Sequence, residues 1–325
     1  MTLRIGILGA ARVATYAMID AARMVDGVVV QAVAARDPGR ARAYADTHGI
    51  VRVYPDYPAL IEADDVDAVY VALPPNLHAR WSIAALAASK PVLCEKPFAL
   101  TTADAEAMVA AEAATGGLLM EAQHSHYHPL SAFMREMVHS GALGTITHID
   151  AMFDAPVPAT PGEIRYDRAV GGGAIWDLGV YPAYWLRSAL REEPEVVSAT
   201  QRRAKGGADI ATKACLRTPS GTAITLRCAM DQPFAAHIRF TGDKGWLDIR
   251  NPLAPHMGHS CRWEIAGTAH ERQFDAPSTY ALQLAAFRDA VLHGAPVATR
   301  GTDSIASIRL LTAIDTKALA LTRES

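Results

Sequence analysis

Cysteines are few in this sequence, and none of them form short-spaced pairs. The 325 residues contain four cysteines, at positions 94, 215, 228 and 261. A disulfide scaffold or a zinc module needs pairs such as C-x-x-C, so the pattern argues against both. It is typical of a reducing compartment, and we expect the protein to be cytoplasmic.

A charge excess and a long apolar run are also missing. The formal net charge is −3, and lysines and arginines are scattered along the chain. Nucleic-acid binding is therefore not expected, because it requires a basic patch. No apolar stretch reaches the length of a membrane span, and Arg12 interrupts the N-terminal apolar segment, which argues against a signal peptide. The composition is that of a globular protein long enough for two domains.

Strand-like and helix-like segments alternate in the first part of the chain. The runs with strand character are 3–9, 28–36, 67–73, 91–97 and 118–123. Helical patterns occupy 37–49, 76–90 and 101–115. This alternation, with short connections and nearly all-apolar strands, predicts a parallel sheet with helices on both faces. The sequence thus predicts an α/β protein that begins with a Rossmann domain over residues 1–123.

The rhythm changes after about residue 125. A helical pattern at 128–141 leads to the segment 147–155. Longer runs with strand character follow at 194–204, 210–218, 222–231 and 236–242, and helical patterns close the chain at 278–293 and 302–321. We expect an α+β domain over 124–325 with a mostly antiparallel open sheet, whose last helix could pack back on the first domain.

The turn after the first strand resembles a dinucleotide-binding turn. Such a turn reads G-x-G-x-x-G/A, because pyrophosphate must approach backbone N–H groups at a helix N-terminus. Here the segment is GAARVA, from Gly9 to Ala14, so Ala11 replaces the middle glycine. The motif alone leaves an ordinary structural turn open. The strand–turn–helix context favours a nucleotide.

The end of the second strand indicates which nicotinamide cofactor is bound. An acid there binds the ribose hydroxyls of NAD, whereas an arginine accommodates the 2′-phosphate of NADP. Ala35 stands where the acid is expected, Arg36 follows, and Arg40 lies one helical turn further on. Arg36 could instead be a solvated loop charge. The pattern favours NADP, while Asp37 keeps NAD possible.

Several motifs together resemble one family. They are the turn at 9–14, PPNLH at 74–78, EKP at 95–97, GGGAIWDLGVY at 171–181 and QLAAFRDAV at 283–291. This set is similar to the Gfo/Idh/MocA family of oxidoreductases, which includes glucose–fructose oxidoreductase and inositol dehydrogenase. The missing second glycine and Tyr181 resemble the branch of dimeric dihydrodiol dehydrogenases and aldose 1-dehydrogenases.

The chain departs from that branch in the segment EAQHSHYHP, residues 121–129. Relatives usually carry an aromatic residue and an arginine where this chain has Ser125 and His126. This segment is expected in the substrate pocket. The departure therefore leaves the identity of the substrate undetermined, whereas the expected type of reaction is unchanged.

The resemblance implies a nicotinamide cofactor, small-molecule substrates, no metal, and a homodimer or larger homo-oligomer. The expected cofactor-binding residues are Gly9, Ala11, Arg12, Val13, Arg36, Arg40, Leu73, Pro74, Asn76, His78, Glu95 and Lys96. Asn76 could instead be a plain helix N-cap. The expected substrate-binding residues are His126, Arg165, Trp176, Asp177 and Tyr181.

Lys96, Asp177 and Tyr181 are the expected catalytic residues. In the implied reaction the cofactor carries hydride, so the protein must move one proton. A free phenol has a pKa of about 10, and a nearby ammonium such as that of Lys96 would lower the pKa of Tyr181. A cis peptide bond is expected between Lys96 and Pro97. If one helix begins in 174–182, Asp177 and Tyr181 share a face, and the glycines before it permit positive φ or close approach.

Some alternatives remain open from the sequence alone. Arg165 could form a structural ion pair, and Trp176 could be a core residue. His124, His126 and His128 alternate, which on a strand would suggest a metal site, but nearby carboxylates at suitable spacing are missing. The expected function is NADP-dependent oxidation or reduction of a sugar, polyol or cyclic trans-diol. The alternatives are an NAD-dependent glycosidase and a non-catalytic NADP-binding sensor.

Overall fold

The computed structural model describes residues 1–323, and the chain divides into two compact units. Of the described residues, the first unit contains 1–124 and 278–305, and the second contains 125–277 and 306–323. The predicted single domain over 124–325 therefore differs from the structure at 278–305. This segment joins the first unit because its helix α10 (Thr279–His293) packs on α2 (Asp20–Ala22). Arg288 Nη1 also donates to Asp26 O at 2.8 Å.

The last helix makes polar contacts within the second unit. This helix, α11 (Thr302–Arg323), belongs to the second unit from residue 306 onward. The reason is a set of polar contacts with the second unit's own residues. Arg168 Nη2 lies 2.7 Å from Asp315 Oδ2, and Arg187 Nη1 donates to Ser307 Oγ at 2.6 Å.

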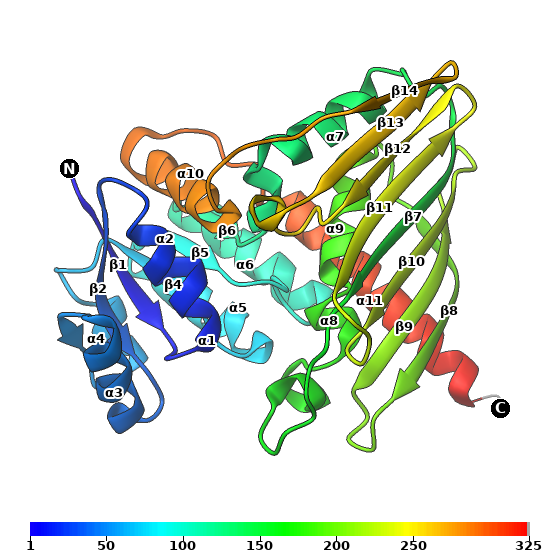
Figure 1. The fold of residues 1–325 in the computed structure, drawn as a ribbon. Helices are drawn as coiled ribbons and strands as arrows, with labels where there is room; N and C mark the ends of the chain where they lie inside the picture. The colour runs from blue at the N-terminus through cyan, green and yellow to red at the C-terminus, as the bar shows by residue number, and fades with distance from the viewer. Residues whose placement is uncertain (324–325) are drawn as a thin grey trace. The chain divides into compact units, whose positions relative to one another are not determined.

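A six-stranded parallel sheet forms the centre of the first unit (Figure 1). Its strands are β1 (Leu3–Leu8), β2 (Val28–Ala34), β3 (Arg52–Val53), β4 (Ala68–Val71), β5 (Val92–Cys94) and β6 (Leu119–Glu121). The strand order is β3-β2-β1-β4-β5-β6, the order of a Rossmann fold with its switch point between β1 and β4. Leu8, Ala34, Val71 and Cys94 are neighbours in register, so these four strands end at one edge of the sheet.

Helices cover this sheet, and β4, β5 and β6 are therefore buried along their whole length. Besides α2 and α10, the helical elements are α1 (Arg12–Ala14), the π-helix η1 (Thr15–Ile19), α3 (Pro38–His48), α4 (Tyr57–Ile61), the 3₁₀ turn η2 (Pro75–Leu77), α5 (His78–Ala87) and α6 (Thr102–Thr115). Local sequence sets the helix ends. Thr101 caps α6 by accepting from Asp104 N, and Gly49 ends α3 in the left-handed conformation.

An eight-stranded sheet forms the second unit, in the order β14-β13-β12-β11-β7-β10-β9-β8. The strands are β7 (Ile146–Asp154), β8 (Glu195–Arg203), β9 (Asp209–Arg217), β10 (Ala223–Ala229), β11 (Ala235–Gly242), β12 (Gly245–Arg250), β13 (Ser260–Ile265) and β14 (Thr268–Glu271). Only β7 and β10 pair in parallel. This confirms the predicted mostly antiparallel sheet, whereas β12, β13 and β14 were not predicted.

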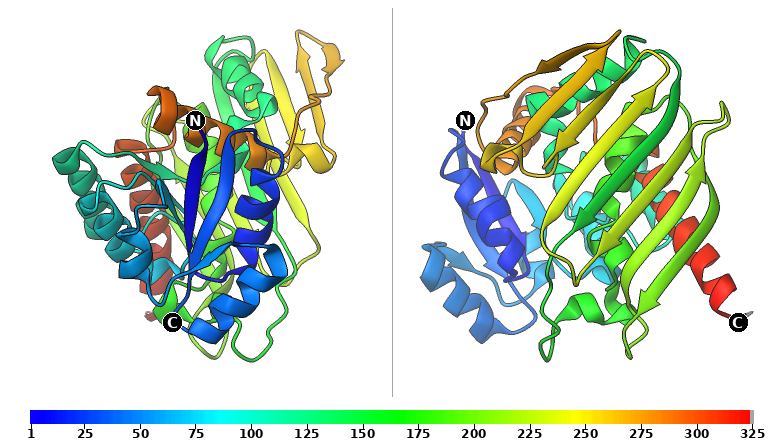
Figure 2. Two further views of the ribbon diagram at one scale, coloured as in Figure 1. Left: turned by 90° about the vertical axis from the view of Figure 1, so that its left-hand side faces the viewer. Right: turned by 45° about the vertical axis from the view of Figure 1, so that its right-hand side comes forward.

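Helices cover one face of this sheet and leave the other open (Figure 2, right). Apolar residues such as Ile149, Leu226 and Phe240 point to the covered face, and polar residues alternate with them. The helical elements of this unit besides α11 are η3 (His124–Tyr127), which starts at the unit boundary, α7 (Pro129–His139), η4 (Ile164–Tyr166), η5 (Arg168–Val170), α8 (Ala174–Asp177), α9 (Val180–Ala189) and η6 (Pro255–Met257).

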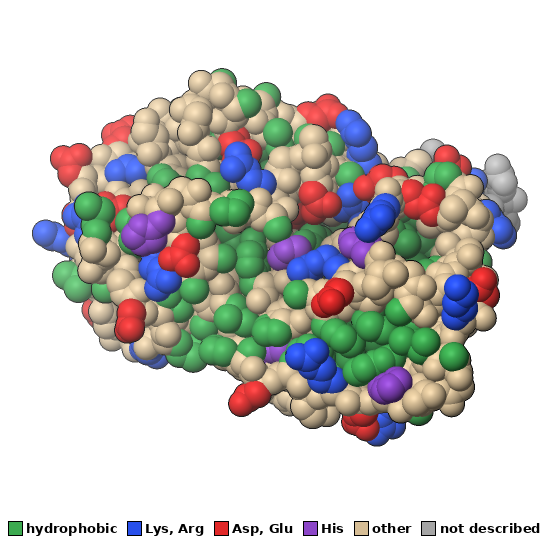
Figure 3. All heavy atoms as spheres, turned by 90° about the horizontal axis from the view of Figure 1, so that it is seen from above, with side chains coloured by type: hydrophobic (Ala, Val, Ile, Leu, Met, Phe, Trp, Pro, Cys, Tyr) green, Lys and Arg blue, Asp and Glu red, His purple; other side chains and the backbone are tan. Residues whose placement is uncertain are grey.

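Charge is mixed over the surface. On the face that Figure 3 shows, basic and acidic side chains are interspersed, in keeping with the scattered charges of the sequence. Among the described residues, a membrane-spanning helix is not found, because none of the helices combines sufficient length with sufficient hydropathy.

Candidate functional site

The turn after β1 has the geometry of an anion cradle. Gly9 has a φ of 105°, and a Cβ at this position would lie 2.5 Å from Ala72 O. A side chain is therefore excluded from this turn. Ala11 is extended, and the helix that follows begins at Arg12. Because the first N–H groups of a helix lack acceptors within the helix, those at Arg12 and Val13 can meet a phosphate.

The end of β2 gathers cations beside this turn. Arg36 is exposed, and Arg40 Nη2 donates to Ala10 O at 2.8 Å, which brings its guanidinium to the turn. Asp37 is the N-cap of α3: its Oδ1 accepts from Gly39 N at 2.8 Å. The acid that kept NAD possible is thus used in capping a helix. This arrangement suits a 2′-phosphate.

The loop after β4 carries Asn76 and His78, and it differs in part from what the sequence predicted. Asn76 lies inside η2 and is exposed, while the N-cap of α5 is Leu77, so the N-cap alternative for Asn76 is wrong. His78 is fully buried. Its Nδ1 and Nε2 each lie 2.9 Å from a backbone carbonyl, those of Pro97 and Leu73. This side chain joins two loops of the sheet edge and does not itself reach the surface.

The loop after β5 carries Lys96. Glu95 is buried, and its Oε1 accepts from Tyr70 Oη at 2.6 Å, while its Oε2 accepts from Lys96 N at 3.2 Å. The peptide bond between Lys96 and Pro97 is cis, as predicted. Lys96 is half-buried and follows directly on the edge where β1, β2, β4 and β5 end. The structure thus places Lys96 and the phosphate turn at one edge of one sheet.

The three glycines 171–173 each have a steric reason. Gly171 and Gly173 have φ values of 94° and 135°. A Cβ on Gly172 would lie 2.5 Å from Ile164 O, and one on Gly173 would collide with the Asp209 carboxylate. Positive φ and close approach were both expected of this segment, and both are found.

Asp209 holds the helix that follows these glycines. Its Oδ2 accepts from Ile175 N at 2.9 Å and from Thr212 Oγ1 at 2.6 Å, and the side chain is fully buried. Burial raises the pKa of this carboxyl, although the two hydrogen bonds partly offset the effect. Asp209 was not predicted, because an acid at the start of a strand gives no signal that it will cap a distant helix.

The segment 174–182 is not one helix. It consists of α8, which ends at Asp177, and α9, which begins at Val180. Gly179 lies between them, and a Cβ there would lie 2.7 Å from Ile175 O. Asp177 and Tyr181 therefore sit on two successive short helices and not one turn apart on a single helix.

Asp177, Arg165 and Tyr181 have defined neighbours in the second unit. Arg165 forms a bidentate pair with Glu163, with Nε 2.9 Å from Oε1, and its Nη1 lies 3.8 Å from Asp177 Oδ2. The structural ion pair expected as the alternative for Arg165 is present, and it adjoins Asp177. The Tyr181 ring packs edge-on against Phe153 at 5.6 Å and is buried. Trp176 is buried too, as a core residue would be.

The three alternating histidines do not lie on a strand. Residues 124–127 form η3, and His128 is the N-cap of α7. His124 Nδ1 bonds Thr279 Oγ1 at 2.9 Å, His126 Nδ1 bonds Tyr184 Oη at 2.7 Å, and His128 Nδ1 accepts from Leu130 N. The geometric premise of a metal site there is thus wrong. Within residues 1–323, His, Cys, Asp and Glu do not form any group of three or more that could hold a metal.

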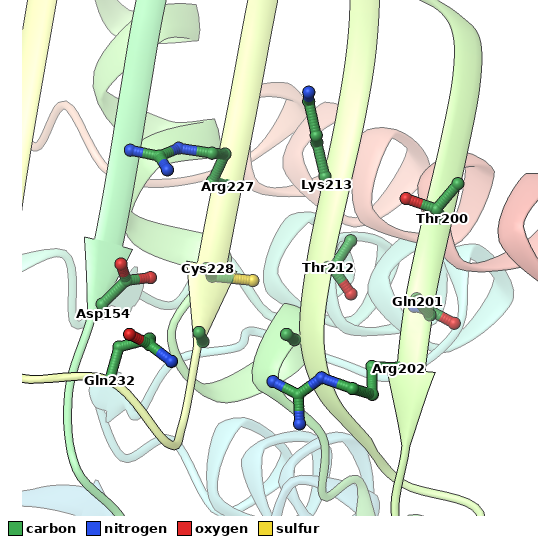
Figure 4. A pocket seen from close by; sticks show the side chains of 11 residues that line it. Asp154, Thr200, Gln201, Arg202, Thr212, Lys213, Arg227, Cys228 and Gln232 are labelled. Carbon is green, nitrogen blue, oxygen red and sulfur yellow. The ribbon is translucent and has the colours of Figure 1, made fainter.

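A hollow of about 450 Å³ lies on the open face of the eight-stranded sheet (Figure 4). Its polar side chains include Arg202, Lys213, Arg227 and Asp154. The predicted site residues do not line this hollow. They lie instead at the edge of the parallel sheet and on η3, η4, α8 and α9.

Comparisons with known proteins agree with this geometry. A model described as an oxidoreductase family with an NAD-binding Rossmann fold matches residues 3–123, and one described as the GFO/IDH/MocA C-terminal domain matches 132–248. The chain is 34% identical to a dTDP-3,4-didehydro-2,6-dideoxy-alpha-D-glucose 3-reductase of Actinomadura kijaniata, over 97% of this chain and 96% of the relative. It is 30% identical to D-xylose 1-dehydrogenase (NADP(+)) 2 of Haloferax volcanii, over 95% of both.

A solved structure is similar over the whole fold. It is a 3-ketoreductase from Actinomadura kijaniata in complex with NADP and TDP-benzene, with a TM-score of 0.89, 32% identity and 98% of both chains covered. Structures of that ketoreductase also exist with a lysine replaced by alanine or glutamate and with a tyrosine replaced by phenylalanine.

Proposed function

The chain belongs to the GFO/IDH/MocA oxidoreductase family, and we propose that it transfers a hydride between NADP and a carbon bearing a hydroxyl or carbonyl group. The substrate is a sugar, a polyol or a cyclic trans-diol. One observation carries the proposal: the phosphate turn, the cations after β2 and Lys96 share one edge of the parallel sheet. Ligands of doubly wound sheets bind at this edge.

The residues present fit NADP. Close packing of Gly9 against Ala72 O requires glycine at this position of the turn, and the free N–H groups at the start of α1 would meet the pyrophosphate. Arg36 and Arg40 supply positive charge for the 2′-phosphate, and the Asp37 carboxylate is held by backbone N–H groups of α3. Ala11, Leu73, Pro74 and Asn76 would line the rest of the site. NADP would supply the hydride acceptor or donor at C4 of its nicotinamide ring.

Tyr181, Lys96 and Asp177 would then manage the proton. Oxidation of an alcohol needs a base on its hydroxyl, and reduction of a carbonyl needs an acid at the same oxygen. We assign this role to the Tyr181 phenol, whose ionised form an ammonium such as that of Lys96 would favour. Asp177, held near Arg165 and carried on a helix that Asp209 caps, orients the substrate hydroxyl.

A substrate panel tests the proposal. Aldoses, ketosugars, polyols and dihydrodiols would be incubated with NADP⁺ or NADPH, and with NAD⁺ or NADH, while absorbance at the nicotinamide band is followed. We expect net turnover with at least one class and a preference for NADP. Release of an aglycone without net change of cofactor would instead identify a glycosidase, and binding of NADP without turnover of any class would identify a sensor.

The expected homodimer and cytoplasmic location stay predictions. The open face of the eight-stranded sheet is the surface that we expect a second copy to cover, as the family resemblance implies. Light scattering should give twice the mass of one chain, and a monomer at micromolar concentration would contradict this.

A further inference from the structure

Arg135 on α7 is a partly buried cation without an acidic partner. Its Nη1 lies 3.3 Å from His126 Nδ1, and the charged or ionisable groups that act on it are the hydroxyls of Tyr184 and Tyr127. Within residues 1–323, no carboxylate forms an ion pair with this guanidinium. Arginine side chains that leave water are normally paired.

Burial acts on this cation in the expected direction. Desolvation lowers the pKa of Arg135 from its ordinary value, while the tyrosines raise it only in part. The group stays charged, because an arginine pKa is far above neutrality. A desolvated guanidinium lacking an anion attracts one, most strongly a planar carboxylate or a phosphate that can accept two of its N–H groups.

His126 adds a donor of fixed orientation beside Arg135. Because a guanidinium can only donate, His126 Nδ1 must accept, and it also lies 2.7 Å from Tyr184 Oη. The imidazole is thus neutral, with its proton on Nε2. Burial, followed by the charge of Arg135, lowers the pKa of His126 to about 3. Arg135 and His126 together therefore keep one net positive charge over the whole pH range in which proteins are assayed.

This cluster adjoins the expected catalytic tyrosine within the second unit. Tyr184 lies three residues after Tyr181 on α9, and the Tyr181 ring lies 6.3 Å from that of Trp185. The Trp185 indole donates to Ser125 Oγ at 3.1 Å. Ser125 and His126 thus contact the helix that carries Tyr181, while the cation comes from position 135 on the neighbouring helix.

We propose that Arg135, His126 and Tyr184 form a subsite for an oxyanion of the substrate, a carboxylate or a phosphate. The substrate would be an acidic sugar, such as a uronate, or a phosphorylated or nucleotide-linked sugar, in preference to a neutral one. This inference rests on the proposed function for the identity of the substrate as a sugar, but the affinity of the subsite for anions does not.

Calorimetry on the full chain with saturating NADP⁺ tests the subsite without need of turnover. The probes are inorganic phosphate, D-glucuronate, D-glucose 6-phosphate and D-glucose. The variants are Arg135→Gln, Arg135→Lys and, as the control, Arg191→Gln, which removes an exposed arginine just after α9. Melting temperatures of all variants show whether each is folded.

We expect the wild type to bind at least one anionic sugar about 10-fold or more tightly than D-glucose. Arg135→Gln should abolish that preference, Arg135→Lys should keep part of it, and Arg191→Gln should keep all of it. Equal affinity of the wild type for neutral and anionic sugars, or a preference that survives Arg135→Gln, would overturn the subsite. A carboxylate-only or phosphate-only preference would identify which oxyanion is recognised.

Turnover separates the subsite from the proposed function. If anions bind through Arg135 but none of the sugars changes the nicotinamide absorbance, the subsite stands and the proposed function fails. If sugars are turned over with equal kcat/KM for matched neutral and anionic members, the function stands and the subsite is refuted.

Discussion

Arg36 is the residue that we propose selects the cofactor. It follows the strand end where an acid would favour NAD, and the only adjacent acid, Asp37, accepts hydrogen bonds from Gly39 N and Arg40 N. A charge-assisted contact to a phosphate is worth about 1.5–3 kcal/mol, or roughly 10- to 150-fold in affinity. If Arg36 binds the 2′-phosphate as proposed, its loss should change the choice of cofactor measurably, even though Arg40 lies nearby.

Arg36→Ala should weaken NADP binding by about 10- to 100-fold and NAD binding by less than about threefold. The loss is selective because only NADP carries the 2′-phosphate. Fluorescence titration of both cofactors measures it. Arg42→Ala is the matched control, since Arg42 is an exposed arginine on α3, the helix that follows Arg36. Equal losses for NADP and NAD would contradict the assignment of Arg36.

For single residues, the sequence predicts the place of a residue in the fold better than it predicts the side-chain contacts of that residue. The turn at Gly9 and Arg36 are predicted from their positions directly after apolar strands, whereas Lys96 is predicted from the EKP motif and the family resemblance. The burial of His78 between Leu73 O and Pro97 O could not be predicted, since its two partners lie on different loops. Arg135 gave no signal either, because only the packing of α7 beside α9 shows that it lacks a partner.

Helices α8 and α9 show what short elements contribute. The glycines 171–173 let the chain pass close to Ile164 O and to Asp209, and Asp209 then caps α8. Asp177 and Tyr181 are thus positioned by backbone geometry that begins several residues earlier. Gly179 separates the two helices. The sequence alone does not predict this break, because single glycines also occur inside helices.

Gly173→Ala should destabilise the protein by about 3 kcal/mol, through backbone strain and a collision with Asp209. Gly162→Ala is the matched control, because Gly162 also has positive φ, 82°, but a Cβ there would meet nothing within 4 Å. That change should cost only about 1 kcal/mol. Urea denaturation compares the two. Similar losses would show that close approach to Asp209 does not matter.

The sheets differ in how far sequence predicts them. Five of the six parallel strands are apolar runs that the pattern alone predicts, whereas β3, with only two residues, was not predicted. In the second sheet, β7 to β11 alternate clearly, whereas β12 to β14 are short and rich in polar residues, and all four residues of β14 are exposed. These strands depend on pairing that starts at β11, and a local sequence pattern cannot predict this pairing.

The molecule as a whole buries several neutral histidines. Burial lowers the pKa of His126 to about 3 and that of His128 to about 4, and it also lowers the pKa of His78. Because these folded-state values lie below the unfolded value of about 6.5, the unfolded chain binds more protons in acid. Stability is therefore fully present above pH 6.5 and falls as the pH decreases toward 4.

His128→Asn should reduce this acid sensitivity. Asparagine can replace His128 as the N-cap of α7, but it does not titrate. The slope of unfolding free energy against pH, between pH 6 and 4.5, should fall by up to about 1.4 kcal/mol per pH unit relative to the wild type. Urea titrations at four pH values measure it. An unchanged slope would mean that His128 is protonated in the folded protein.

The assignment of the family reaction to this molecule requires that residues of both units act on one substrate. Lys96 belongs to the unit built on the parallel sheet, and Tyr181 to the unit built on the antiparallel sheet. If both serve proton transfer, replacing either should lower the rate of the chemical step and leave cofactor binding intact.

The most direct test is the single-turnover rate of hydride transfer, followed by nicotinamide absorbance, in the wild type, Lys96→Ala, Tyr181→Phe and the exposed-lysine control Lys205→Ala. Both site variants should be slower by about 10²- to 10⁴-fold, the usual contribution of acid–base catalysis. NADP affinity should stay within about threefold, and the control should match the wild type. Near-normal rates in Lys96→Ala and Tyr181→Phe would contradict the account.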